Sequence, residues 1–487
     1  MGKHYINRTV WVAAILLIVE LGTYAQSGTV FQKMYREKRT DDCRDFQPTS
    51  DGYLLAGLST SFTTNGDSDI YIQKMNTEGV EQWQKSIGGS GQELACSIYP
   101  TSDGNYILAG STTSKGSGSY DAYLVKISPS GDLIWDKTYG GSGIDQAREA
   151  YPTSDGGFIV AGYTTSGSSQ MWMFKVDASG NQQWSKTFGG ANSDYAYSVK
   201  PTTDGGYILL GSTFSYGSAG DFWLIKTNAS GDSLWGRVFG GAQNEEGQFV
   251  IQDSDGGFVM VGDQQSSSAG DYDVSVRKFD GSGNSVWSRL YGGAGKDVVK
   301  MIQKTSDGGF VVAAISRELN ANPDMWMIKL DGQGNQQWSK LFGGKEHEHC
   351  YAAKQTSDGG YLIAGHTDSA PSIGIDVFLV KTDATGLSAP TITPVTATNA
   401  NLVMKNYLYV YPNPVKDQLH ISLDAPLGNC QLKISNTLGQ TVATKEIAAM
   451  DQPQDIMVET TALDKGIYFL QIQNKEESLY SQKIIVQ

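Results

Sequence analysis

A segment of about 51 residues recurs along this chain, and the repetition constrains the fold more than any other feature of the sequence. In each copy an acidic residue follows ten positions after a tryptophan, and the aspartate of a Ser/Thr-Asp-Gly turn follows twenty positions after it. A lysine stands nine positions before the same tryptophan. The tryptophans are Trp83, Trp135, Trp184, Trp235, Trp287 and Trp338. Equal units of this kind predict a repeat architecture.

Each copy is predicted to form four short strands. In the copy after Trp135 they cover residues 146–151, 157–162, 171–176 and 183–188, which are rich in aromatic and β-branched residues. The second strand is a continuous apolar run, as is typical of a strand covered on both faces. Four-stranded units repeated around a channel form a β-propeller, which leaves only short sheet edges open. The sequence therefore predicts an all-β propeller.

The two ends of the repeat region complement each other. Phe31 stands where the register requires a tryptophan, ten positions before Asp41 and twenty before the turn aspartate Asp51. Lys381, in contrast, has no tryptophan nine positions after it. We therefore predict seven blades over residues 29–384, with the N-terminal strand closing the last blade. The turn aspartates and the lysines of the third strands are expected to pair within blades.

A candidate ligand site lies at one rim of the predicted propeller. All variation in repeat length falls between the second and third strands, and the strand order places these loops beside seven acids. We expect the acids either to accept backbone hydrogen bonds in the glycine-rich links or to form a carboxylate rim for calcium or a polyhydroxylated or cationic ligand. No cofactor is expected otherwise. The acids are Asp41, Glu93, Asp145, Asp194, Glu245, Asp297 and Glu348.

The strongest departure from the repeat is a histidine-rich stretch in the last copy. His347 and His349 flank Glu348, and folding the hairpin about the next turn places His349 opposite His366. Imidazoles are ligands for zinc and other transition metals. His347, His349 and His366 are therefore candidate metal ligands, and the alternative is a polar loop with a semi-buried histidine.

The N-terminus reads as a signal peptide over residues 1–25. Two cations precede an apolar stretch at residues 10–19, and Ala25 ends a small-residue cleavage site. No transmembrane span is expected after its removal, because the apolar stretch is short for a bilayer. The formal net charge is −14 and no basic run occurs, so nucleic acid is an improbable partner. Four scattered cysteines do not form a disulfide framework.

The run from Lys175 to Trp184 resembles the tryptophan-docking repeat of quinoprotein-like and kelch-like propellers. That resemblance implies that each tryptophan packs between neighbouring blades. Quinoprotein dehydrogenases typically have eight blades and a dedicated set of residues for quinone and calcium. This sequence has seven copies and no clear counterpart of that set, so the resemblance implies architecture and no quinone site.

The last eighty or so residues carry a second resemblance. A linker at residues 385–406 precedes Tyr411-Pro412-Asn413-Pro414, and the turn at residues 436–440 and the segments 466–470 and 483–486 follow. This set, in this order, is similar to the type A sorting domain of the type IX secretion system of Bacteroidetes. The resemblance implies export by that machinery to the cell surface or the medium. From its strand pattern alone, the segment 407–487 predicts a small Ig-like β-sandwich.

Taken together, these features favour a secreted binding module over an enzyme. No nucleophile elbow, P-loop, zinc-protease or dinucleotide motif occurs, so no catalytic residue is assigned. The expected partner is an extracellular glycan or protein, at the bacterial surface or outside the cell. The alternative is a carbohydrate-active or other hydrolase that uses rim carboxylates, or an adhesive protein without a small ligand.

Overall fold

The structure is a computed structural model, and all of its regular secondary structure is β-strand. It describes residues 30–35, 40–61, 67–165, 167–217, 219–265, 271–293, 295–317, 322–344, 346–368, 375–388, 408–411, 415–423, 430–436, 440–447, 454–473 and 478–486. The signal peptide predicted at residues 1–25 and most of the predicted linker lie outside these ranges. Within them, no helix is long and apolar enough to cross a membrane.

Seven four-stranded antiparallel sheets occupy the described part of the repeat region. In six of them the four strands follow one another along the chain. The first three sheets are β2 (Asp41–Thr49), β3 (Gly52–Ser59), β4 (Asp69–Asn76) and β5 (Glu81–Ile87); β6 (Glu93–Pro100), β7 (Tyr106–Thr112), β8 (Asp121–Ile127) and β9 (Leu133–Tyr139); and β10 (Asp145–Pro152), β11 (Phe158–Thr165), β12 (Ser169–Val176) and β13 (Gln182–Phe188).

The next three sheets repeat this plan. They are β14 (Asp194–Pro201), β15 (Tyr207–Thr213), β16 (Asp221–Thr227) and β17 (Ser233–Phe239); β18 (Glu245–Gln252), β19 (Phe258–Gln265), β20 (Tyr272–Phe279) and β21 (Ser285–Tyr291); and β22 (Asp297–Lys304), β23 (Phe310–Ser316), β24 (Asp324–Leu330) and β25 (Gln336–Phe342). The seventh combines β26 (Glu348–Gln355), β27 (Tyr361–Thr367) and β28 (Asp376–Thr382) with β1 (Phe31–Tyr35) from the other end of the repeat region.

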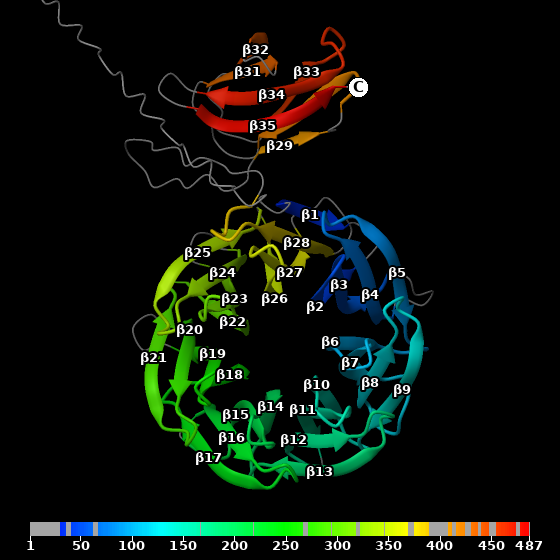
Figure 1. The fold of residues 1–487 in the computed structure, drawn as a ribbon, viewed down its shortest axis with the longest axis vertical. Coiled ribbons are helices and arrows are strands. Elements are labelled where there is room, and N and C mark those ends of the chain that lie inside the picture. The colour runs from blue at the N-terminus through cyan, green and yellow to red at the C-terminus, as the bar shows by residue number, and fades with distance from the viewer. Residues whose placement is uncertain are drawn as a thin grey trace, which may run out of the picture.

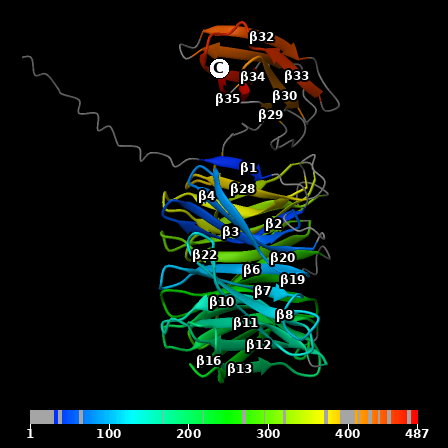
Figure 2. The ribbon, with the colours of Figure 1, turned by 90° about the vertical axis from the view of Figure 1, so that its right-hand side faces the viewer.

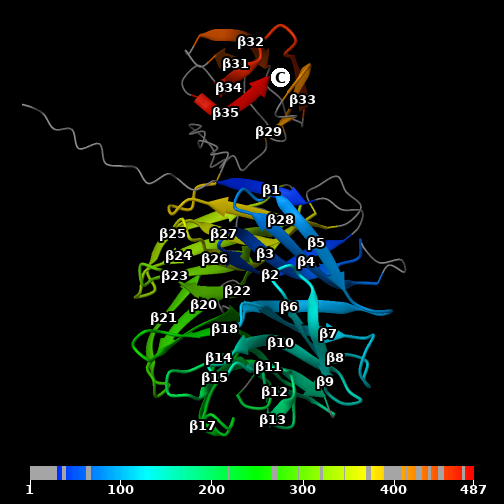
Figure 3. The ribbon, with the colours of Figure 1, turned by 45° about the vertical axis from the view of Figure 1, so that its right-hand side comes forward.

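The sheets follow one another around a central opening, with the first strand of each nearest the centre and the fourth outermost (Figure 1). Figures 2 and 3 show that inner strands such as β6 and β10 run roughly along the axis of this opening, whereas Figure 1 shows outer strands such as β13 and β21 lengthwise around the circumference. Second and third strands are almost completely buried, because each is sandwiched between neighbouring sheets, whereas the outer strands consist mostly of exposed and half-buried residues. The apolar runs of the second strands thus supply the core that the sequence predicted.

The chain ends of the repeat region meet at a seam between the seventh and first sheets. β1 pairs with β28, with Met34 opposite Phe378. Phe31 packs edge-on against Tyr53 of the first sheet, with ring centroids 6.4 Å apart, and the Tyr35 hydroxyl donates a 2.6 Å hydrogen bond to the Gly79 carbonyl. The first inner strand, β2, also contacts β26, β27 and β28. The N-terminal strand therefore joins the last sheet, as the register predicted.

Each repeated tryptophan lies half-buried between two sheets. Trp135, on β9, packs at a tilt against Phe158 of the next sheet, with ring centroids 6.2 Å apart, and covers the turn glycine Gly180. Gly180 has a φ of +77°, and a Cβ there would lie 3.1 Å from the Trp135 ring, so both its backbone conformation and its contact require glycine. Trp184 and Trp338 make the same contacts with the sheets that follow them.

All seven predicted aspartate–lysine pairs occur, with N–O distances of 2.6–2.9 Å. In each pair the lysine stem is buried, and the turn aspartate is at least half exposed except Asp358, which is 30% exposed. Such half-exposed pairs contribute about 0–1 kcal/mol each. They are Lys74–Asp51, Lys126–Asp103, Lys175–Asp155, Lys226–Asp204, Lys278–Asp255, Lys329–Asp307 and Lys381–Asp358.

The C-terminal segment forms two further antiparallel sheets with a core of their own, made of aliphatic side chains such as Leu419, Leu432 and Leu470. No residue of this core belongs to the repeat region. One sheet contains β29 (Leu408–Tyr411), β30 (Gln418–Leu423) and β33 (Gln454–Glu459). The other contains β31 (Cys430–Asn436), β32 (Thr441–Ile447), β34 (Gly466–Gln473) and β35 (Ser478–Val486).

Candidate functional site

The seven acids predicted as ligand-binding residues all begin inner strands, and all seven side chains are buried. In six of them a carboxylate oxygen accepts a hydrogen bond from the backbone N–H of the glycine four positions earlier, at 2.7–3.2 Å. Asp41 instead accepts a 2.7 Å hydrogen bond from the Ser61 hydroxyl. These contacts fix the glycine-rich links between sheets, which is the first of the two predicted interpretations. A ligand at these acids remains a prediction.

The structure brings two of the three candidate histidines together. The rings of His349 and His366 stack with centroids 5.1 Å apart, and His366 Nδ1 lies 2.8 Å from Asp42 Oδ1. Burial and the neighbouring His366 lower the pKa of His349 to about 4. His347 points elsewhere, to Asn322 at 3.0 Å. In the described residues no group of three or more His, Cys, Asp or Glu suits a metal ion, so the metal site also remains a prediction.

A cavity of about 350 Å³ lies among the inner strands at the centre of the ring of sheets, and sequence analysis did not predict it. One residue from every inner strand lines it, and this is always the fourth residue, counting the buried acid as the first. The pairing register slips at this residue in all seven inner strands, so each is a β-bulge that turns the same position towards the channel. The seven are Arg44, Cys96, Arg148, Tyr197, Gln248, Lys300 and Tyr351.

Three of these seven residues are cations. Arg44 is neutralised by Asp42 at 2.6 Å and lies over the Tyr351 ring at 4.3 Å. The Arg148 guanidinium lies between the rings of Tyr163 and Tyr197, at 5.6 and 5.8 Å. Among the described residues Arg148 and Lys300 form no ion pair. The cavity therefore holds two positive charges that the protein does not pair directly.

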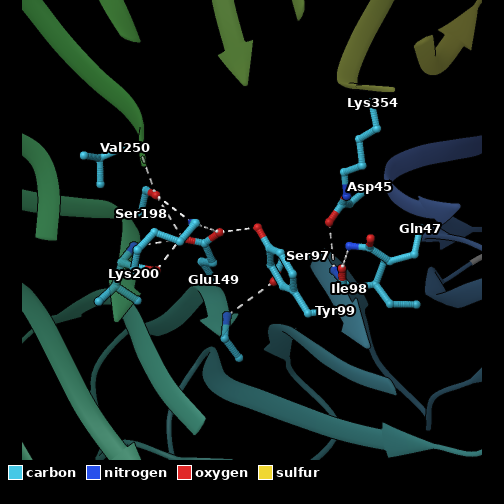
Figure 4. A network of polar contacts seen from close by, with 12 residues as sticks. Asp45, Gln47, Ser97, Ile98, Tyr99, Glu149, Ser198, Lys200, Val250 and Lys354 are labelled. Atoms are coloured by element: carbon cyan, nitrogen blue, oxygen red, sulfur yellow. Dashed lines mark hydrogen bonds and ion pairs between the residues drawn. The ribbon is translucent and has the colours of Figure 1, made fainter. Parts of the chain in front are cut away.

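Beside the bulges runs a chain of polar links between neighbouring inner strands (Figure 4). Asp45 accepts a 3.0 Å hydrogen bond from the Ile98 N–H of the next sheet, and Glu149 accepts one of 2.8 Å from the Val199 N–H. Ser97 and Ser198 occupy the same position in their own strands and accept the corresponding N–H groups of their neighbours. These residues therefore tie adjacent sheets together.

Two buried lysines neutralise the carboxylates of these links. Lys354 lies 2.6 Å from Asp45, and Lys200 lies 2.5 Å from Glu149. Tyr99 also donates a 2.5 Å hydrogen bond to Glu149. Although Asp45 and Glu149 border the cavity, their charges are compensated by protein groups, so they are structural rather than ligand-binding carboxylates.

Replacing Lys354 with methionine is expected to destabilise the protein strongly. Lys354 and Asp45 join the seventh sheet to the first, and removing the lysine leaves a buried carboxylate without its counter-charge. The expected loss is about 3–5 kcal/mol in the free energy of unfolding, measured in urea. Lys85→Met is the control, because its pair with Asp132 is exposed and screened by solvent, so its loss is expected to change the stability little. Equal losses in the two variants would contradict the seam role of Lys354.

Asp263 is a carboxylate that the repeat does not require. Sister sheets place Ser111 or Ser212 at its position, and Ser212 accepts the Gly247 N–H of the next sheet at 3.1 Å. Asp263 accepts the equivalent Val299 N–H at 2.6 Å and turns its second oxygen towards Gln248 in the cavity. Burial raises the pKa of Asp263 to about 7, Lys300 opposes this rise, and Glu246 adds to it.

This pKa predicts a pH-dependent stability. Because the folded pKa lies above the ordinary value of 3.8, the native state holds the proton more tightly between pH 4 and pH 7. The free energy of unfolding therefore falls as the pH rises through that window. Relative to Asp263→Asn, the unchanged protein is expected to lose roughly 2–3 kcal/mol between pH 5 and pH 8 in urea unfolding. Parallel plots of the free energy of unfolding against pH for the two proteins would refute the raised pKa of Asp263. Asp263→Ser tests whether the hydrogen bond to the Val299 N–H alone is enough to maintain the stability.

Comparison with known proteins identifies the C-terminal segment. Residues 409–487 match the family of secretion system C-terminal sorting domains. This match confirms the resemblance of the tail to type IX sorting domains and indicates that the protein is exported to the surface or the medium. The molecule is thus an exported all-β protein built from repeated four-stranded sheets. A search of curated proteins found no match.

Several solved structures overlap with the chain at low similarity. PorZ, a surface component of the type IX secretion system of Porphyromonas gingivalis, is 14% identical with a TM-score of 0.43 over 93% of this chain and 61% of its own. The chain therefore spans less than two thirds of the length of PorZ. Sqt1 of Chaetomium thermophilum is 8% identical with a TM-score of 0.43 over 72% of this chain and 100% of its own. The β-propeller domain of the Trilobed protease of Pyrococcus furiosus is 8% identical with a TM-score of 0.40, over 76% and 100%.

Proposed function

We propose that this protein is a non-enzymatic binding module, exported through the type IX machinery by a type A sorting domain, that holds a small polar ligand in its central channel. The proposed organisation is a signal peptide at residues 1–25, a propeller at 29–384, a linker at 385–406 and an Ig-like sorting domain at 407–487. The export half of this proposal is supported by the family match of the tail. The binding half rests on the cavity.

The proposed propeller has seven blades and is closed. Support comes from the seven four-stranded sheets in the described residues and from the pairing of β1 with β28. Each inner strand contacts the next, and β2 contacts β26. One core cluster joins Phe46 of the first sheet, Val311 of the sixth and Ile363 of the seventh. Closure gives the channel a continuous wall, which a binding cavity within it needs.

One observation carries the binding proposal, namely the divergence of the fourth residue of the inner strands. The acids, turn aspartates, lysines and tryptophans recur in nearly every copy, and the structure gives each of these sets a structural contact. The cavity position, in contrast, holds five different residue types in seven copies, all of them able to recognise a ligand. The repeated fold does not require different residues at this position. A site that is specific for one asymmetric ligand does require them.

The proposal is tested by glycan-array and small-molecule screening of the purified mature protein together with a variant whose cavity is filled. Val298 lines the cavity, so Val298→Trp is expected to abolish binding. Val286, 58% exposed on the outer strand β21, offers the matched control Val286→Trp, which is expected to bind normally. Equal binding of a ligand to both variants would show that the site lies on the rim or the outer surface and not in the cavity. A protein partner would give the same result.

A hydrolase is the alternative function, and Asp263 is the observation that favours it. A carboxyl group with a pKa near 7 is suited to proton transfer at neutral pH, and Glu246 supplies a second carboxylate in the same cavity. Both oxygens of Asp263 already accept hydrogen bonds from the protein, which favours the binding function. Turnover of a bound glycan that disappears in Asp263→Asn while binding persists would establish the hydrolase instead.

A further inference from the structure

We infer that the channel cavity selects a small anionic ligand whose carboxylate or phosphate is bound by Arg148 and Lys300. This inference rests on the proposed binding function and names the chemical class of the ligand. Its basis is the pair of positive charges of Arg148 and Lys300, which face the cavity and form no ion pair among the described residues. Neither cation takes part in a structural contact of the repeat, because both stand at the divergent bulge position.

Of the two cations, Arg148 is the better preorganised for binding an anion. The rings of Tyr163 and Tyr197 hold its guanidinium in place, and the Cys96 and Tyr163 side chains form hydrogen bonds with it. In the described part of the chain its Nε is buried and has no hydrogen-bond partner. A buried donor without an acceptor costs about 1–3 kcal/mol, so a site that keeps one is built for an acceptor supplied from outside. Guanidinium groups pair with carboxylates and phosphates through two parallel hydrogen bonds.

Lys300 presents the second charge from another side of the channel. It lies on β22, three sheets along from β10, which carries Arg148. Among the described residues Lys300 makes no hydrogen bond or ion pair, although its charge opposes the rise in the pKa of Asp263. Cations that converge on one enclosed space from different walls focus a positive potential there.

The carboxylates that border the cavity cancel this potential only in part. Asp45 and Glu149 are neutralised by Lys354 and Lys200. The Tyr197 hydroxyl, a neutral group, donates a 2.7 Å hydrogen bond to Glu246 and supplies no counter-charge. Burial raises the pKa of Asp263 to about 7, which reduces the negative charge of this carboxyl at neutral pH. Glu246 is left to accept hydrogen bonds from ligand hydroxyls, since both oxygens of Asp263 already accept hydrogen bonds from the protein. The cavity therefore fits a molecule with one anionic group and several hydroxyls, and about 350 Å³ suffices for a single acidic sugar.

The test is calorimetric titration of the mature full-length protein with four sugars of nearly equal size. The probes are D-glucuronate and D-glucose 6-phosphate, which are anionic, D-glucose, which is neutral, and D-glucosamine, which is cationic. At least one anionic probe is expected to bind about tenfold or more tightly than glucose, and glucosamine is expected to bind worst. A preference between the two anionic probes distinguishes a carboxylate from a phosphate ligand.

Variants assign the recognition to the two cations. Arg148→Gln and Lys300→Gln are each expected to weaken binding of the anionic probe about 10- to 100-fold. Arg289→Gln is the matched control, because Arg289 also lies over an aromatic ring, Trp287 at 5.9 Å, but on the exposed outer strand β21. If Arg148→Gln fails to fold, Lys300→Gln still tests the inference. This variant is expected to fold, because the Lys300 side chain forms no hydrogen bond within the described residues.

Three results would overturn the inference. One is binding of glucose or glucosamine as tight as that of the anions, and another is unchanged anion binding in both glutamine variants. The third is the absence of binding by either anionic probe. If neutral sugars bind and Val298→Trp abolishes that binding, the anionic ligand class is wrong while the binding function stands. If Val298→Trp changes the binding of no ligand in the wider screen, the binding function itself fails.

Discussion

A protein that begins at residue 40, and so lacks β1, is expected to lose about 5 kcal/mol or more of its free energy of unfolding. Loss of a buried aromatic side chain alone costs about 3–5 kcal/mol, and Phe31 is 6% exposed at the seam. The deletion also removes five residues of pairing with β28 and the Tyr35–Gly79 hydrogen bond. Urea unfolding of the truncated and full-length mature proteins measures the difference.

Two substitutions separate the loss of the strand from the loss of its aromatic anchor. Phe31→Ala is expected to produce much of the destabilisation of the deletion, because Phe31 fills the gap between the seventh and first sheets. Phe31→Trp is expected to be tolerated, since the other six sheets carry tryptophan at this position. An unchanged unfolding midpoint in the deletion would mean that β1 does not close the propeller, and the seven-bladed proposal would fail with it.

Removal of residues 409–487 is expected to abolish export in a host with a type IX system. The segment matches a sorting domain, and its core is built only from residues of the tail. The truncated protein should therefore accumulate inside the cell envelope while its repeat region melts at the same temperature as before. Immunoblots of the cell-envelope and extracellular fractions measure the first effect, and circular dichroism measures the second.

The complementary experiment joins residues 407–487 to a reporter that carries a signal peptide. The reporter is expected to reach the surface or the medium if the tail is sufficient for export. A reporter that stays inside the envelope, or a truncated protein that is exported as before, would contradict the role given to the tail. Loss of the melting transition on truncation would instead show that the tail stabilises the repeat region.

Most of the fold could be predicted because its causes are local in sequence. A turn aspartate, a third-strand lysine and an outer-strand tryptophan keep fixed spacings, since each blade repeats the same strands and turns. All seven Asp–Lys pairs and the packing of Trp135 against the next sheet followed from these spacings. The seam was predictable for the same reason, because Phe31 falls in the register of the tryptophans.

The candidate site could not be predicted in the same way. The seven acids attracted attention because they recur, yet recurrence reflects their shared hydrogen bonds to glycine N–H groups in the links. The signal that would have found the cavity was the opposite one, a position at which the copies disagree. Arg44, Arg148 and Lys300 stand three residues after their acids, and comparing the copies shows this position to be variable. Its orientation, however, depends on a bulge that the sequence pattern does not reveal.

The sequence by itself determined the repeat, the four strands of each unit, the seam between the chain ends and the sorting tail, since alternation, turn chemistry and motif order act over short distances. Only the tertiary structure decided which charged residues are compensated and which face the cavity. Asp45 finds Lys354 more than three hundred residues away, whereas Arg148 finds no carboxylate among the described residues. Charge pairing depends on proximity in space, and that proximity exists only once the sheets are assembled around the channel.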